Sequence, residues 1–344
     1  MSISIEPLNP RSAGFNVIDC AIKNRDILYL LAREDYTQHP GWRDGREAPG
    51  EGRLAKRLLS LNLKNPDEKK WGIGHLRGLG ASVCGVAFAP EEKVVVLDST
   101  SKAWSPTPGS DGFEGPIPSQ FEGGVKRGGF SRARSFGGRL FASSTARQLF
   151  VRTAPGKWDL VGEPMPEPDE YKISFVDFDG FGPEDLYAVG DPGDIWHLSG
   201  QVWKRMKFPS NWGLSAVCCA GDGNVYVAAG DHVFRGLGDK WEKLKTKAQI
   251  SLPIKDLVWY DGELWATNDY GVWVLKDEGL VDADVPSGVK VCSGNLATRD
   301  GVLLLAGYGG AAYKRDGQWT EIFHDHEVRE WFETNRDKVW TPPK

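Results

Sequence analysis

The chain has 344 residues, of which 40% are hydrophobic, 42 are Lys or Arg and 47 are Asp or Glu, giving a formal net charge of −5. This composition is sufficient to bury a core, which excludes an intrinsically disordered chain. The mildly acidic balance argues against a protein that holds nucleic acid through its phosphates, because such a protein needs a cationic surface, and it leaves room for a basic partner.

The N-terminal segment, MSISIEPLNPRSAG, lacks the cationic region and apolar core of a secretory signal. Glycines interrupt the longest apolar stretches well before they reach the length of a membrane span. We therefore expect a cytoplasmic protein that does not contact membranes. The five cysteines are odd in number and lack a CxxC spacing, which indicates reduced, buried thiols and no disulfide framework.

The N-terminal part of the chain predicts three groups of short strands. The first group runs through 15–34, is interrupted by a charged insertion rich in Pro and Gly at 35–53, and resumes at 58–71. The second group starts at 83–104, and its outer strand is expected within 105–118. Long loops in compact folds are often functional, so the insertion is a candidate binding segment. Thr107 to Gly124 is expected to be a flexible loop within a single domain that spans residues 1–344.

The third group, at 137–161, ends on a strand that contains Trp158. Four further segments share its plan, and three of them contain Asp-Gly pairs at a fixed spacing, with the aspartates at 222, 261 and 300. Asp-Gly accommodates the positive φ angles of a type I′ turn, so it predicts the hairpin between the first two strands of each unit. A second break precedes the third strand, and a third break introduces an outer strand that begins near a tryptophan: Trp203, Trp241 or Trp319.

A period of about 40 residues with several short strands is typical of an array of small stacked sheets. Counting units over 15–322 gives seven, so the predicted fold is all-β, a seven-bladed β-propeller of four-stranded antiparallel blades. The chain resembles the β-propeller superfamily, in the loose sense of WD-repeat, kelch and BNR arrays, although it lacks the signature motif of each. More distantly, it resembles the propeller-type immunity proteins of bacterial toxins. The resemblance implies a fold and says little about activity.

Few residues suggest chemistry. Cys218 and Cys219 are neighbours on the inner strand of one blade, so their side chains point to opposite faces and cannot bind one metal together. Cys20, Cys84 and Cys292 are expected on the inner strands of other blades. His324 and His326 lack a third ligand nearby. Asp177, Asp179, Glu184 and Asp185 lack the spacing of a calcium loop and are better interpreted as a turn. We expect no cofactor and no metal.

The tail at 323–344 has a helical pattern, with Val328, Trp331 and Phe332 on one side.

These observations favour a non-catalytic protein-binding module, most concretely an immunity protein that blocks a bacterial toxin such as a nuclease. Its partner is expected to be a basic protein, and the chain is expected to be a monomer apart from that partner. The candidate contacts are acidic and aromatic residues of the insertion and of the breaks between second and third strands: Trp42, Asp44, Glu47, Asp191, Asp194, Asp231, Asn268, Asp269, Tyr270 and Tyr308. Two alternatives remain open: a lyase or hydrolase acting on a sugar or small molecule at the central channel, and an assembly scaffold.

Overall fold

The computed structural model describes residues 3, 6–38, 48–115, 117, 129–163, 165, 174–277 and 279–339. The chain divides into two compact units. The smaller unit comprises Met1–Ala81, Asp269–Gly271 and Asp284–Lys344, and the larger unit comprises Ser82–Asn268 and Val272–Ala283.

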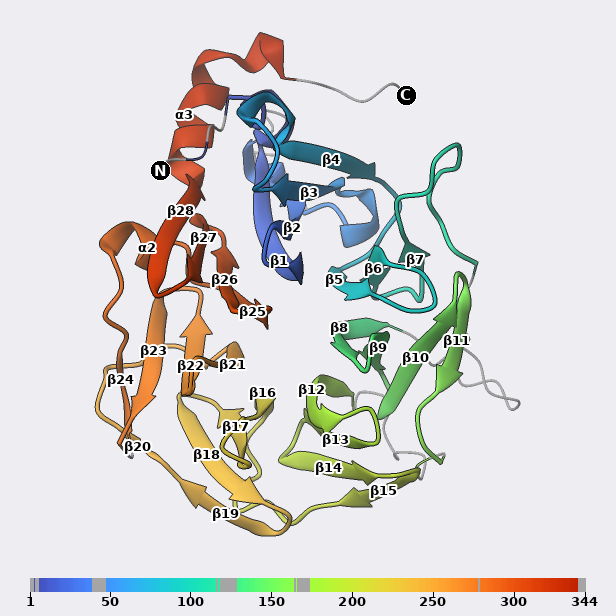
Figure 1. Ribbon diagram of the computed structural model, residues 1–344, viewed down its shortest axis with the longest axis vertical. Coiled ribbons are helices and arrows are strands. Elements are labelled where there is room, and N and C mark those ends of the chain that lie inside the picture. The colour runs from blue at the N-terminus through green and yellow to red at the C-terminus, as the bar shows by residue number, and fades with distance from the viewer. Residues whose placement is uncertain are drawn as a thin grey trace. The chain divides into compact units, whose positions relative to one another are not determined.

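The strands form seven sheets, numbered here 1 to 7 in chain order, and neighbouring strands of one sheet are consecutive in the sequence almost throughout (Figure 1). The smaller unit holds sheets 1 and 7. Sheet 1 consists of β1 Phe15–Asn24, β2 Ile27–Glu34, β3 Lys56–Asn62 and β4 Trp71–Leu76. Sheet 7 consists of β25 Asn295–Arg299, β26 Val302–Gly307, β27 Gly310–Arg315 and β28 Gln318–His324.

The larger unit holds the other five sheets. Sheet 2 consists of β5 Ser82–Ala87, β6 Lys93–Asp98 and β7 Ala103–Trp104. Sheet 3 consists of β8 Phe130–Phe136, β9 Arg139–Ser144, β10 Gln148–Ala154 and β11 Lys157–Leu160. Sheet 4 consists of β12 Phe175–Gly182, β13 Asp185–Gly190, β14 Asp194–Ser199 and β15 Val202–Arg205. Sheet 5 consists of β16 Leu214–Cys219, β17 Val225–Ala229, β18 His232–Leu237 and β19 Lys240–Lys243. Sheet 6 consists of β20 Lys245–Thr246, β21 Asp256–Tyr260, β22 Glu263–Asn268, β23 Gly271–Lys276 and β24 Gly279–Asp282.

The prediction of seven successive antiparallel sheets is confirmed, and two sheets depart from four strands. Sheet 2 has three among the described residues, and an isolated bridge between Trp104 and Phe113 lies in the region where its outer strand was expected. Sheet 6 has five, because β20 adds to β24 in parallel orientation. The segment that leaves sheet 5 thus pairs with the outer strand of sheet 6 and ties the two sheets together.

The Asp-Gly hairpins adopt the expected geometry at two of the three repeats. Asp261-Gly262 and Asp300-Gly301 have positive φ at both residues, as a type I′ turn requires. At Asp222-Gly223 only the glycine has a positive φ, and the Asp222 carboxylate accepts the backbone N–H of Asn224 at 2.9 Å. Five residues, 220–224, separate β16 from β17 here, whereas two residues separate the strands at each of the other two hairpins.

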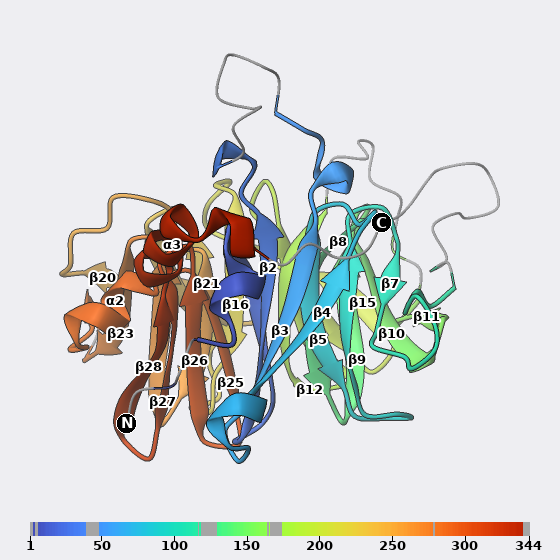
Figure 2. The same cartoon turned by 90° about the horizontal axis from the view of Figure 1, so that it is seen from above.

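The described residues form three short α-helices, α1 Asn9–Ser12, α2 Ser287–Val291 and α3 Asp325–Thr334. Short 3-10 helices lie at Tyr36–Gln38, Glu51–Arg53, Asp67–Lys69 and Arg336–Lys338. Helix α3 follows β28 directly and packs against α1 (Figure 2). The predicted apolar side of the tail is confirmed, since Val328 is buried and Trp331 and Phe332 pack against the same core. No helix among the described residues is long and apolar enough to cross a membrane.

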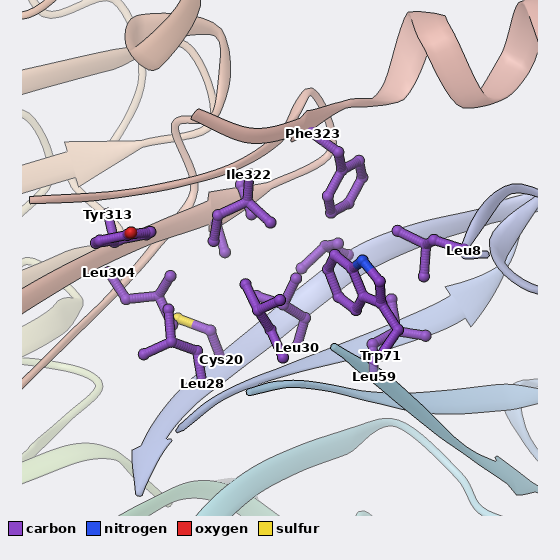
Figure 3. Packing of buried hydrophobic residues seen from close by; sticks show 14 of the residues in the cluster. Leu8, Cys20, Leu28, Leu30, Leu59, Trp71, Leu304, Tyr313, Ile322 and Phe323 are labelled. Atoms are coloured by element: carbon purple, nitrogen blue, oxygen red, sulfur yellow. The ribbon is translucent and has the colours of Figure 1, made fainter. Parts of the chain in front are cut away.

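The core of the smaller unit lies between its two sheets. Side chains from β1 to β4 face side chains from β26 to β28, and α1 and α3 cover one end (Figure 3). Leu28, Leu30 and Leu304 in this core are fully buried. The first and last sheets of the chain therefore share one hydrophobic core.

The outer-strand tryptophans pack between sheets of the larger unit. Trp203 of β15 lies 5.8 Å from Phe175 in its own sheet, measured between ring centroids, and its Nε1 donates to the carbonyl of Val161 at 2.9 Å. Val161 follows β11 of the preceding sheet. Trp203 therefore packs against its own sheet and against the sheet that precedes it in the chain.

Candidate functional site

In the larger unit, the turns between second and third strands lie beside the links that join successive sheets. The backbone N–H of Gly193 donates to the carbonyl of Trp212 at 2.9 Å, and that of Ile254 donates to Gly230 at 2.8 Å. Two predicted residues are accessible here. Asp191 is exposed, and the side chain of Asp231 is 49% exposed. Among the described residues, neither makes an ion pair with Lys or Arg, although the Asp231 carboxylate lies 3.4 Å from Nε2 of His232.

Asp194 does not belong to this accessible surface. Its side chain is fully buried, and it accepts from Nε of Arg147 at 2.6 Å and from Nε1 of Trp196 at 3.0 Å. Arg205 lies 3.3 Å from the same carboxylate. Because Arg147 comes from sheet 3 and Asp194 from sheet 4, this ion pair holds two sheets together. The sequence placed Asp194 at the correct turn, but the first residue of β14 points inward toward the cations.

Asn268 is also buried, with 2% of its surface exposed. Its Nδ2 donates to the carbonyl of Leu252 at 3.0 Å, which fixes the link between sheets 5 and 6. This residue positions a link and does not present its own side chain. The neighbouring predicted residues differ, because Tyr270 is 73% exposed and Asp269 is partly exposed.

Tyr270, Asp269 and Tyr308 belong to the smaller unit. Tyr308, between β26 and β27, is 43% exposed, and Val291 at the end of α2 is 52% exposed. The carbonyl of Val291 approaches Gly309 so closely that a Cβ there would lie 2.1 Å from it, which brings α2 against the turn that carries Tyr308. Trp42, Asp44 and Glu47 fall within 39–47, outside the described residues.

The structure adds an aromatic residue that the sequence analysis missed. Trp212, in the link between sheets 4 and 5, is 47% exposed and stacks on the ring of His232 with centroids 5.2 Å apart. Leu252, in the next link, is 42% exposed. The signal was present, since Trp212 lies in KFPSNWG, away from any strand pattern. We call Asp191, Trp212, Asp231, His232 and Leu252 the Trp212 surface.

A second cluster lies on the inner strands of the larger unit. Arg132 and Arg134 of β8 pair with Asp177 of β12 at 3.2 Å and with Asp256 of β21. Asp177 also accepts the backbone N–H of Val217 at 2.9 Å. These contacts join strands of four sheets. The prediction of a turn at Asp177 and Asp179 is wrong, because β12 extends through both residues.

Burial dominates the electrostatics of this cluster. It raises the pKa of the Asp179 carboxyl to about 6, although Arg134 and the backbone N–H of Cys219 oppose the rise. It also raises the pKa values of the Cys218 and Cys219 thiols well above the ordinary range. Burial alone would lower the pKa of Arg134, but nearby aspartates, Asp177 foremost, raise it overall. Opposite charges thus compensate one another within the cluster, as in a structural ion-pair network.

The cysteines lie mostly on inner strands, as expected. Cys20, Cys84, Cys218 and Cys219 occupy β1, β5 and β16, and all but Cys219 are buried. Cys292 is buried but follows α2 and does not lie on a strand, which corrects the predicted register. Within the described ranges, no three His, Cys, Asp or Glu side chains are grouped so as to hold a metal ion.

The fold of this chain is similar to those of solved structures that share little of its sequence. Virginiamycin B lyase from Staphylococcus aureus has a TM-score of 0.57, and the match covers 90% of this chain and 94% of that one at 10% identity. The WD40 β-propeller domain of Doa1 has a TM-score of 0.59, with 88% and 94% covered at 11% identity. This chain is a seven-bladed β-propeller. No protein-family model matches its sequence.

The propeller is also similar to a curated protein. It is 28% identical, over 241 residues, to the immune protein Tsi7 of Pseudomonas aeruginosa. The match covers 69% of this chain and 78% of that protein. This likeness agrees with the resemblance to immunity proteins drawn from the sequence.

Proposed function

We propose that this propeller is an immunity protein that binds a bacterial toxin and neutralises it without catalysing a reaction. The observation that carries the proposal is the similarity to immune protein Tsi7 over most of both chains. An immunity protein acts by occupying its toxin, so it needs an exposed surface that a second protein can bind. In this proposal the complex forms in the cytoplasm.

We propose that the toxin contacts the Trp212 surface. It combines an exposed indole with two accessible carboxylates, Asp191 and Asp231, and an exposed leucine. Aromatic side chains contribute large contact area at interfaces, and like-signed carboxylates attract and orient a cationic partner. A basic toxin, for example one whose active site holds nucleic acid, fits this chemistry.

The backbone around Trp212 is restrained before any partner binds. The carbonyl of Trp212 accepts the N–H of Gly193, and its own N–H donates to Oγ of Ser210 at 3.1 Å. At Gly213, an added Cβ would lie 2.1 Å from Oδ1 of Asp191, so glycine lets this carboxylate approach the link. A restrained surface loses little conformational entropy on binding, which favours affinity.

The test is a growth assay in which the chain is produced together with a candidate basic toxin, and the kinetics of their binding are measured. The unaltered chain is expected to restore growth. Trp212→Ala should weaken the complex by about 2 kcal/mol or more, mainly through faster dissociation. The double variant Asp191→Lys and Asp231→Lys should slow association and reduce its dependence on salt.

Matched controls lie elsewhere on the larger unit. Val202→Ala removes an apolar side chain that is 56% exposed, and Asp159→Lys reverses an exposed charge on β11. Both variants are expected to bind as the unaltered chain does. Loss of binding in the controls, with normal binding in the Trp212 and aspartate variants, would overturn the choice of surface. A chain that neither binds nor neutralises the toxin would overturn the function.

A further inference from the structure

Three arginines of the smaller unit surround one histidine. Arg57 of β3 lies opposite His75 of β4 in the antiparallel register, Arg77 follows the end of β4, and Arg11 belongs to α1. All three lie close enough to His75 for their charges to act on its imidazole. Arg11 and Arg77 are exposed, whereas Arg57 is only 4% exposed. The group therefore has a buried base and an accessible rim.

The guanidinium of Arg57 is incompletely satisfied. Its Nη1 is buried and has no hydrogen-bond partner among the described residues. Its Cζ stands 3.8 Å from the centroid of the Phe15 ring, so the planar group stacks on an aromatic face. Stacking occupies the face of a guanidinium and leaves its N–H groups, which lie in the plane, able to donate. A buried donor without an acceptor is costly, and native proteins seldom keep one without a reason.

Nearby cations are paired, which makes this group distinct. Arg33 lies 2.6 Å from Glu51, and Lys56 lies 3.4 Å from the same residue. Arg11, Arg57 and Arg77 make no such ion pair with any residue in the described ranges. Glu34 attracts Arg57 only from longer range, and its Oε2 accepts the N–H of Ala55 at 2.9 Å.

The local electrostatics agree with an excess of positive charge. Burial, together with Arg57, Arg11 and Arg77, lowers the pKa of His75 to about 4. Burial also lowers the pKa of Arg57 to about 10, against the attraction of Glu34. At neutral pH the site thus contains three guanidinium charges and an uncharged imidazole, and the Glu34 carboxylate attracts Arg57.

We propose that Arg11, Arg57, Arg77 and His75 form a binding site for a doubly charged oxyanion of the phosphate type. Arginine forks match the geometry of phosphate oxygens, and three of them carry enough charge for a dianion. Arg57 donates hydrogen bonds to the anion from the buried part of the site, and Arg11 and Arg77 donate from the exposed edge of the site. The site belongs to the smaller unit and is independent of the Trp212 surface and of toxin binding.

Calorimetric titration of the full chain with inorganic phosphate tests the site directly, with sodium chloride at equal ionic strength as the reference. Arg57→Met, Arg11→Gln and Arg77→Gln should each weaken phosphate binding by about 10- to 100-fold, the contribution of one charge-assisted hydrogen bond. Arg25→Gln changes an exposed arginine of the same unit that pairs with Asp316, and it should leave binding unchanged. The two rim variants keep the test valid if the buried variant fails to fold.

NMR titration of the His75 ring gives a second readout. Bound phosphate should raise the pKa of His75 by about 1 to 3 pH units, because it places negative charge beside the imidazole. Adenosine monophosphate distinguishes the source of the anion. Equal affinity for both ligands supports a site for free phosphate, and tighter binding of the nucleotide supports a site for a phosphate ester. Absence of phosphate binding together with an unchanged His75 pKa, or equal loss of binding in Arg25→Gln, would overturn the proposal.

Discussion

Asp179 is a carboxyl group whose ionisation at neutral pH opposes folding. Burial raises its pKa from 3.8 to about 6, so the folded chain holds this proton more tightly than the unfolded chain does. The free energy of unfolding should therefore fall as pH rises from about 4 to 6, and the destabilisation is fully present above pH 6.

The substitution Asp179→Asn removes this ionisation and keeps an acceptor for the N–H of Cys219. We expect it to raise the free energy of unfolding at pH 8 by about 1 to 3 kcal/mol and to have little effect at pH 4. Urea denaturation at the two pH values measures both effects. Asp159→Asn, on an exposed strand position, is the control. Equal effects of Asp179→Asn at both pH values would show that its ionisation is not the cause.

Arg57 is a buried basic side chain, and burial lowers its pKa where it raises that of Asp179. Its pKa falls to about 10 on folding, so the charged guanidinium destabilises the fold below that pH, and the effect disappears only in strongly alkaline solution. Without phosphate, Arg57→Met should raise the free energy of unfolding at pH 7 by about 1 to 3 kcal/mol. Thermal and urea denaturation in phosphate-free buffer measure the change. A marked loss of stability would mean that Arg57 is already compensated within the fold.

At the scale of the element, the inner strands depend on charge as well as on apolar packing. Asp256 is fully buried at the start of β21 and pairs with both arginines of β8. Replacing it with Asn leaves buried cations with too few partners, which should cost about 3 to 5 kcal/mol of stability. Chemical denaturation measures the loss. Asp284→Asn, at an exposed position, should change stability by less than about 0.5 kcal/mol.

The sequence determines strands and turns well because their signals are local. Asp261-Gly262 and Asp300-Gly301 specify their own hairpins, and the outer strands begin near tryptophans where they were predicted. It could not distinguish Asp191 from Asp194, since the direction of each side chain depends on Arg147 in another sheet. The network of Arg132 with Asp256 was missed for the same reason, because its members are far apart in the chain. Trp212 was overlooked because it lies in a link and not in a turn between second and third strands.

For the whole molecule, thiol reactivity reports how tightly the sheets pack. Four of the five cysteines are buried, and burial raises the pKa of Cys292 to about 12. A thiol reagent at pH 8 should therefore modify at most Cys219 quickly in the native protein, and all five after denaturation. Counting the released chromophore before and after denaturation tests this. Rapid modification of several thiols in the native state would indicate sheets that separate readily.

The shared core of sheets 1 and 7 has a consequence for synthesis on the ribosome. Leu28 and Leu30 emerge early, but the residues that cover them, such as Leu304 and Ile322, are among the last to be made. Contacts between such distant parts of a chain form late and slowly. A nascent chain that stops short of sheet 7 leaves the apolar face of sheet 1 exposed to chaperones and proteases. The cell thus accumulates the folded molecule only from messages that are translated through the last sheet.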